Sequence, residues 1–312
     1  MGNLKDLKLA TTVSVSSNYA GTDAGEIIGA AFKEANTISR NLVTVLPDID
    51  FQISLRKLAY ADGRVDYACG FAPTGSVTLS ERLLTPKKIM NQQEVCKEDL
   101  RQIWSSATMG FSAHNDRMPT DVSEALIMEI LADTAEAVDK DIWQGDATNT
   151  GEFDGFIKLW TADGSVVKPT ALAAAIDKSN VIAETEKVIN ATPQAIAQAS
   201  DVVWGISYNW ALALEQAMVS AGISNGLGGN AHQLQYGSRV FEVINGLPNN
   251  TMVVYRRKNL YMGTGLLNDF QRIAIADGDD FGRLDDAVRF NMVYTAGVQY
   301  ANSEDVVYYK SL

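Results

Sequence analysis

The clearest periodic pattern in the chain is a long amphipathic segment in its second quarter. Apolar residues recur every three or four positions and charged residues fall between them, the two sets being Ile127, Leu131, Ala135, Val138 and Ile142 against Glu129, Asp133, Glu136 and Lys140. Asp121 and Glu124 form a pair typical of a capping box, and Gly145 is a stop signal. The pattern predicts a helix of about 23 residues, roughly 35 Å long.

Between Phe51 and Leu84 the apolar residues change from helical spacing to short strand-like runs. Asp62-Gly63 is a tight-turn signal between ISLRKLAY and RVDYACGF, and APTG separates the second run from SVTLSERLL. The pattern predicts a long β-hairpin or meander. Charged and aromatic residues are interleaved along it, namely Arg56, Lys57, Tyr60, Arg64, Tyr67, Phe71 and Arg82. Two strands alone are marginally stable, so we expect this hairpin to need a partner surface.

The remainder of the chain mixes short helical patterns with strand patterns. Helical spacing covers residues 23–36, 97–104, 176–189, 193–199 and 209–222, and strand-like runs cover residues 201–207, 251–276 and 288–309. Thr192 is a candidate N-cap with Pro193 at the first helical position, and Gly222 is a stop signal. Helices among antiparallel-looking strands, without βαβ repetition or an internal repeat, indicate the α+β class.

Length and composition leave room for two compact domains or one extended protein with a sizeable core. The chain has 312 residues, of which 46% are hydrophobic. There are 26 basic and 38 acidic residues, giving a net charge of -12, and no basic run stands out. This balance argues against direct readout of DNA or RNA. It is compatible with enclosing DNA, because an acidic wall repels phosphate and lets packed nucleic acid slide.

The chain carries no evident targeting signal. The first 20 residues contain lysines and serines in place of an unbroken apolar stretch, which makes a poor signal peptide, and no apolar run approaches the ~18 residues of a membrane span. Two cysteines, Cys69 and Cys96, are too few for a disulfide framework, and a reduced cytoplasmic site of folding is the default. We expect both to be small buried hydrophobes, although they could meet if the hairpin folds back.

One short motif suggests nucleophilic catalysis. Residues 222–226, GISNG, match the G-x-S-x-G pattern around Ser224, and His232 follows shortly after. A nucleophile elbow requires a strand before the serine and a helix after it. Here a predicted helix precedes the motif and a glycine-rich loop follows. A flexible loop is therefore the favoured interpretation, with a hydrolase that uses Ser224 and His232 as an alternative.

No metal or nucleotide site is predicted from the remaining motifs. The acidic run Asp277–Gly282 is similar to a calcium loop, but Phe281 and Val288 stand where an EF-hand has ligands. A solvated turn is favoured over a looser divalent site. Only two histidines occur, His114 and His232, which excludes a histidine-rich site by count. Dinucleotide-binding and Walker A motifs are missing, so no catalytic, cofactor-binding or metal residue is predicted.

Taken in order, these segments resemble the major capsid protein of tailed bacteriophages, the Hong Kong 97 fold. The resemblance rests on the order and spacing of the hairpin, the long helix ending in IWQGD, the loop GEFDGF at residues 151–156, and the closing strands RFNMVYTAGVQY and EDVVYY. It covers nearly the whole chain. The stretches CGFAPTGSVTLSERLLTPKKI and VCKEDLRQIW are most similar to capsid proteins of crAss-like phages and related phages of gut bacteria.

The resemblance implies a domain organisation and a set of assembly contacts. It divides the chain into an N-terminal arm at residues 1–45, an E-loop hairpin at 46–100, a P-domain at 101–160 and 281–312 that contains the spine helix, and an A-domain at 161–280. The contacts that it suggests lie on the hairpin and in the loop GISNGLGGN, at Arg56, Arg64, Tyr67, Phe71, Arg82, Gly228 and Gly229.

The resemblance also implies a structural role without enzymatic activity or a cofactor. Subunits of the family assemble as hexamers and pentamers, in the host cytoplasm, into an icosahedral shell that encloses double-stranded DNA in the virion. Portal and decoration proteins are expected partners. The chain has no long charged N-terminal extension, so we expect a separate scaffold protein or prior processing. Lys57, Lys87 and Lys88 do not align with the family's crosslinking lysine, and no crosslink is predicted. An encapsulin-type shell, which packages a cargo enzyme, is the main alternative.

Overall fold

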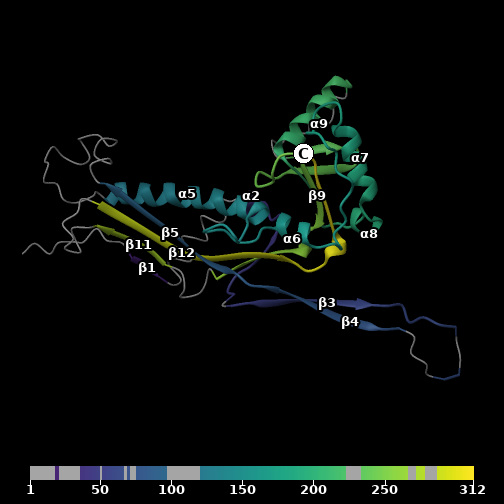
Figure 1. Ribbon diagram of the computed structural model, residues 1–312, viewed down its shortest axis with the longest axis horizontal. Helices are drawn as coiled ribbons and strands as arrows, with labels where there is room; N and C mark the ends of the chain where they lie inside the picture. The colour runs from purple at the N-terminus through teal and green to yellow at the C-terminus, as the bar shows by residue number, and fades with distance from the viewer. Residues whose placement is uncertain are drawn as a thin grey trace, which may run out of the picture.

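The protein is elongated, with a helix-covered platform, a thicker region beside it and a projecting hairpin (Figure 1). The structure is a computed structural model. It describes residues 18–20, 36–49, 51–66, 69–70, 75–96, 120–222, 233–265, 272–277 and 287–312. Helices and strands are mixed without βαβ repetition, which confirms the α+β class.

The platform is a six-stranded sheet built around one long strand, β12 (Ala287–Tyr300). One edge of β12 pairs antiparallel with β5 (Lys87–Cys96). The other edge is shared in succession by β11 (Arg272–Asp277) and β10 (Leu260–Thr264). Two short strands complete the sheet at its margins, β1 (Asn18–Ala20) on β11 and β2 (Thr44–Leu46) on β10.

The predicted amphipathic helix is present as α5 (Thr120–Gln144), which lies along one face of the platform (Figure 1). Its buried residues include Ile130, Val138 and Ile142, which share a core with every second residue of β12 from Val288 onward. This arrangement follows from the two periods, 3.6 in the helix and 2 in the strand. Residue 121 lies in the first helical turn and is therefore not the N-cap that the sequence suggested.

The chain leaves α5 through a rigid corner. A side chain at Gly145 would collide with the carbonyl oxygens of Phe153 and Asp141, and the Gly155 amide donates to the Gly145 carbonyl oxygen at 2.9 Å. Within the loop that follows, the Lys158 ammonium donates to the carboxylates of residues 146 and 154 at 2.7 and 2.6 Å. These contacts return the chain to the core in α6 (Phe156–Ala162).

The thicker region contains a five-stranded sheet whose two faces belong to two different cores. Its strands, in spatial order, are β13 (Val306–Lys310), β9 (Thr251–Arg256), β6 (Val202–Ile206), β8 (Arg239–Val243) and β7 (Gln233–Tyr236). Val253 and Tyr255 face the core of α5, whereas Met252 and Val254 face the opposite core. Burial on both faces explains why VVWGI, TMVVYR and VVYYK are almost continuously apolar.

Three helices accompany the second core: α7 (Val181–Ala191), α8 (Gln194–Ala197) and α9 (Tyr208–Ser220). The Trp210 indole donates to the Thr185 hydroxyl at 3.0 Å and joins α9 to α7. Gly222 has φ +73 just after α9, which confirms the predicted stop.

Several predicted boundaries were wrong. Pro193 is the N-cap of α8, and Thr192 is the C-cap of α7. The predicted strand-like run is interrupted between residues 251 and 264 by a 3₁₀ turn, η2 (Arg257–Asn259). Buried Asn259 hydrogen-bonds to the Asn302 backbone at this turn, and β9 and β10 on its two sides belong to different sheets. Residues 23–35 of the helix expected over 23–36 lie outside the described residues, and α2 (Asn36–Ser39) begins at residue 36. The helix expected at 97–104 lies outside the described residues.

The predicted hairpin exists, but its pairing differs. β3 (Ile53–Tyr60) pairs antiparallel with β4 (Val77–Leu84), so the predicted tight turn at Asp62-Gly63 is wrong. Residues 64–66 of the expected middle strand form no strand. The Asp62 carboxylate instead accepts from the Arg64 backbone amide and guanidinium, and the Ala61 amide donates across the connection to the Ser76 carbonyl oxygen at 2.8 Å. The two strands are therefore joined by a wide connection.

Candidate assembly surface

One face of the hairpin presents apolar side chains to solvent. Directly opposed residues of an antiparallel pair share a face, and the register places Leu58 opposite Leu79. Four apolar residues on this face are largely exposed, namely Leu58 (68%), Val77 (64%), Leu79 (62%) and Leu83 (48%). We call these four residues the apolar hairpin face. The opposed residues Arg56 and Glu81 lie among them and are exposed as well.

The opposite face of the hairpin is anchored to the body of the same chain. Arg82 pairs with Asp163 at 2.5 Å, and its guanidinium lies 4.2 Å from the ring centroid of Tyr300. The Tyr300 hydroxyl donates to the same carboxylate at 2.7 Å. Nearby, the Lys57 ammonium donates to the Asn302 side-chain oxygen at 2.6 Å. We call Arg82, Asp163 and Tyr300 the hairpin clamp.

The electrostatics of the hairpin clamp keep it charged. Burial acts to raise the pKa of Asp163, but hydrogen bonds from the Ser165 amide, the Tyr300 hydroxyl and Arg82 outweigh it and hold this pKa well below its usual range. Burial, together with the bond to Asp163, raises the pKa of Tyr300 to about 12. The carboxylate is therefore ionised and the phenol neutral near neutral pH, so the ion pair does not titrate there.

The residues suggested by the sequence occupy different settings. Arg56 lies on the exposed side of the hairpin, whereas Arg82 contacts its own subunit through the hairpin clamp. Arg64 is exposed in the connection and pairs with Asp62. The other four suggested positions, Tyr67, Phe71, Gly228 and Gly229, lie outside the described residues.

Sequence reasoning missed the apolar hairpin face. Alternating apolar residues in ISLRKLAY and VTLSERLL were its signal, since Leu58, Val77, Leu79 and Leu83 all occur there. The pairing of these two runs with one another was needed to place the four side chains on one face. Assigning RVDYACGF as the partner strand obscured this.

A second apolar strip lies on α9. Tyr208, Leu212 and Val219 follow helical spacing and are all exposed, while the opposite side of the helix is buried through Trp210 and Leu214. Three large apolar side chains in line on a helix are more than scattered surface hydrophobes. This strip is therefore a second candidate contact surface.

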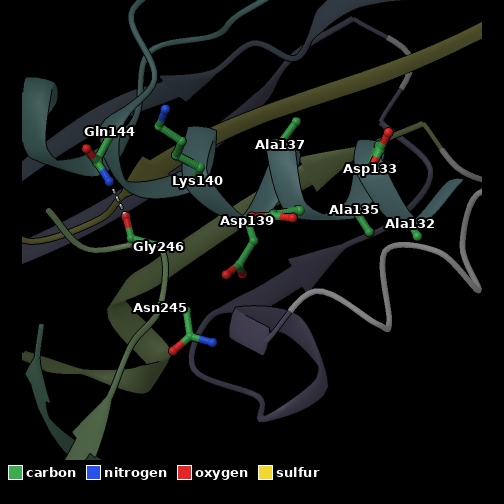
Figure 2. Close-up of a pocket in the computed structure, with 10 residues that line it drawn as sticks. Ala132, Asp133, Ala135, Ala137, Asp139, Lys140, Gln144, Asn245 and Gly246 are labelled. Carbon is green, nitrogen blue, oxygen red and sulfur yellow. Dashed lines mark hydrogen bonds between the residues drawn. The ribbon is translucent and has the colours of Figure 1, made fainter. Parts of the chain in front are cut away.

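A groove of about 680 Å³ runs beside α5 (Figure 2). It lies between the helix and the Asn245–Gly246 segment, and the Gln144 amide donates to the Gly246 carbonyl oxygen at 2.7 Å. Asp139 faces into it, and burial raises the pKa of this carboxyl. Its Oδ1 accepts the Thr37 backbone amide at 2.8 Å. The carboxylate thus joins α2 to α5, and the groove lining brings no nucleophile and base together.

Other candidate chemistry finds little support in the part of the chain that the structure describes. Within it, no group of histidine, cysteine and carboxylate side chains could hold a metal ion. Both cysteines, Cys69 and Cys96, are exposed and unpaired, so the expected burial was wrong. Ser224, His232, His114 and the residues after Asp277 in the acidic run fall outside the described residues. Among the helices described, none is long and apolar enough to cross a membrane.

Comparisons with known proteins place the fold. No protein-family model matches the sequence, and a search of curated proteins finds no match. A chain of the satellite phage P4 procapsid that includes size determination (Sid) protein is similar with a TM-score of 0.61 and 10% identity, over 91% of this chain and 89% of that one. A capsid chain of the empty GTA particle has a TM-score of 0.60 and 12% identity, over 89% and 90%.

A chain of Gordonia phage Cozz is also similar, with a TM-score of 0.54 and 15% identity over 88% of this chain and 86% of that one. The likeness in all three cases extends over most of both chains, so the whole architecture is shared. The chain has a phage capsid fold, which confirms the fold inferred from the sequence. The narrower likeness to crAss-like phages and the division into arm, E-loop, P-domain and A-domain stay predictions.

Proposed function

We propose that the chain is the major capsid protein of a tailed bacteriophage, which self-assembles as hexamers and pentamers into an icosahedral shell around double-stranded DNA. The observation that carries this proposal is the likeness to capsid chains over about nine tenths of the length. The same fold supports a structural role without enzymatic activity. Assembly in the host cytoplasm, followed by residence in the virion, is part of the proposal.

The apolar hairpin face provides a physical reason for association. A two-stranded sheet is marginally stable alone, and this one exposes four aliphatic side chains on one side. Full burial of an aliphatic side chain contributes about 1.5–3 kcal/mol, and these side chains are about half to two-thirds exposed. A neighbouring subunit that covers the face would thus gain a few kcal/mol. Such a contact is weak singly and becomes strong when repeated around a closed shell.

The proposed domains assign separate contacts to separate parts of the molecule. In the A-domain, the strip of Tyr208, Leu212 and Val219 on α9 is available for a second contact around the symmetry axes. The spine helix α5 and the long strand β12 belong to the proposed P-domain. The net charge of -12 fits a wall that encloses DNA without binding specific sequences. Scaffold, portal and decoration proteins are the further partners we propose.

Expression of the full chain, followed by sedimentation and electron microscopy, tests the proposal. We expect closed shells, and we expect Leu58→Asp with Leu79→Asp to abolish them, because two buried unpaired charges would be placed in the contact. Thr78→Asp with Ser80→Asp adds two charges to the other face of the same hairpin and is the matched control. Circular dichroism verifies that each variant is folded.

Two outcomes would contradict the proposal. Monomers only, at every salt concentration and with phage scaffold and portal supplied, would count against a capsid role. Small uniform shells that contain a protein cargo and no nucleic acid would favour the encapsulin-type alternative.

A further inference from the structure

The fold brings two short basic runs together at the base of the hairpin. Arg56 and Lys57 belong to β3, Arg256 ends β9, and Lys258 lies in the turn between β9 and β10. All four residues line one pocket of about 230 Å³. We call it the basic pocket. The rest of its lining consists of Asn259, Ala301, Asn302 and Asp305.

Two of the four cations have no charge partner within the described part of the chain. Arg256 pairs with Asp201 at 3.1 Å, and Lys57 lies 3.6 Å from the Glu304 carboxylate. The side chains of Arg56 and Lys258 make no ion pair or hydrogen bond with any described residue, and both residues are exposed. Asp305 is the one acidic side chain in the lining. Four like charges with partial compensation attract an anion and cost free energy without one.

The position of the basic pocket indicates what fills it. Arg56 lies on the same side of the hairpin as Leu58 and Leu79. A neighbouring subunit that covers the apolar hairpin face therefore also contacts Arg56, which borders the basic pocket. Every copy of the chain carries 38 acidic residues, so carboxylates are abundant on such a neighbour. No basic stripe continues from the pocket along the sequence, which disfavours a DNA backbone as the ligand.

We propose that the basic pocket binds a carboxylate of a second copy of this chain, and that this charge contact sets the register of the subunit contact at the apolar hairpin face. The proposal rests on the capsid function. Apolar contacts are not directional, whereas an arginine or lysine that meets a carboxylate fixes position and disfavours wrong partners. The pocket thus supplies specificity, and the apolar hairpin face supplies most of the attraction.

A pair of double variants with equal charge tests the proposal. In Arg56→Gln with Lys258→Gln, the two cations without partners lose their charge. In Lys140→Gln with Lys310→Gln, the same charge is removed from two exposed positions outside the pocket. At about 0.1 M salt we expect the first variant to need a roughly tenfold higher concentration to assemble, and the second to follow the wild type. At about 1 M salt, where screening shortens the field to about 3 Å, the difference should vanish.

The outcomes separate this inference from the function on which it rests. Wild type that never assembles refutes the capsid function itself. If the wild type assembles and the Arg56→Gln, Lys258→Gln variant assembles equally well, the proposal for the basic pocket is refuted and the capsid function is not. Both variants are first verified to melt like the wild type. Shells of that variant that form normally but retain less DNA would identify phosphate as the ligand and overturn the carboxylate assignment.

Discussion

At the scale of single residues, the carboxyl group of Asp141 lies where its ionised form is destabilised. It lies half-buried in the last turn of α5, where the carbonyl ends of the helix already carry negative charge. Burial, together with the nearby Glu152 carboxylate, raises the pKa of Asp141 to about 6, and Lys140 offsets part of this rise. On the facing strand, burial and the Asp141 charge raise the pKa of Tyr294 to about 12. Ionisation of Asp141 therefore opposes folding.

The consequence is a stability that falls as pH rises. The folded protein holds the Asp141 proton more tightly than the unfolded chain, whose ordinary pKa is 3.8, so the free energy of unfolding decreases between pH about 4 and 6 and then levels off. We expect Asp141→Asn to remove this decrease and to be about 1 kcal/mol more stable at pH 7, a figure reduced for solvent screening. Urea unfolding of the unassembled chain at pH 5 and pH 7 measures it. Asp133→Asn, exposed on the same helix, is the control, and an unchanged pH profile in Asp141→Asn would contradict the assignment.

At the scale of elements, the hairpin is held at a set angle by polar contacts at its base. Arg82, Asp163 and Tyr300 join β4 to the body, and the Gln299 side chain donates to the Leu83 carbonyl oxygen at 3.0 Å. On β3, the Lys57 ammonium adds a hydrogen bond to the Asn302 side-chain oxygen at 2.6 Å. The hairpin clamp thus determines the direction in which the apolar hairpin face is presented.

Loss of the hairpin clamp should loosen the hairpin and spare the rest of the fold. Arg82→Gln removes the ion pair and the contact with the Tyr300 ring, which we expect to lower the local opening free energy by about 1–2 kcal/mol. Amide hydrogen exchange in β3 and β4 should become roughly five- to thirtyfold faster, with β12 unchanged. Arg64→Gln, which breaks only the exposed local pair with Asp62, serves as the control. Equal exchange rates in the two variants would show that the hairpin clamp does not stabilise the hairpin.

Elements with a strong hydrophobic period could be predicted from the sequence. Elements that depend on pairing between strands far apart in the sequence could not. The spine helix and the strands β6, β12 and β13 were indicated by apolar residues at helical spacing, in alternation or in continuous runs. The hairpin register was not, because the local signal at Asp62-Gly63 is overridden when Asp62 bonds to Arg64 and the connection closes further along. Local turn preference is weaker than pairing over eight residues.

The candidate site shows the same limit. Arg56, Arg64 and Arg82 were all singled out as hairpin charges, but their roles differ because their partners come from elsewhere in the chain. Nothing in the sequence joins Arg56 to Lys258, since the two meet only when β3 lies beside the turn after β9. Distances between charges are properties of the tertiary structure.

At the scale of the whole molecule, the five-stranded sheet joins the two cores into one folding unit. Neighbouring residues of β9 alternate between them, and β13 does the same through Tyr308 and Tyr309. If the sheet separated from one core, the apolar side chains of the other core would also be exposed to solvent. The proposed division into domains therefore does not imply independent stability.

Cooperative unfolding is the expected result. With 5-fluorotryptophan in place of tryptophan, Trp143 in one core and Trp210 in the other should lose their folded ¹⁹F NMR signals at the same urea concentration. Trp143→Phe and Trp210→Phe assign the two signals. The exposed Val240→Ala variant, on the surface of β8, controls for general effects of substitution. Two separated midpoints would show that the cores unfold independently.

The long strand β12 also makes the molecule mechanically unequal in different directions. Of its 14 residues, 287–296 pair with β5 on one edge, while 288–293 pair with β11 and 296–300 with β10 on the other. Tension along the strand loads these hydrogen bonds in shear and all at the same time. A pull across the sheet, perpendicular to the strands, would break them one after another. The subunit is thus stiff along its platform and softer across it. In the proposed shell, internal pressure would therefore concentrate strain across the platform and spare the direction of β12.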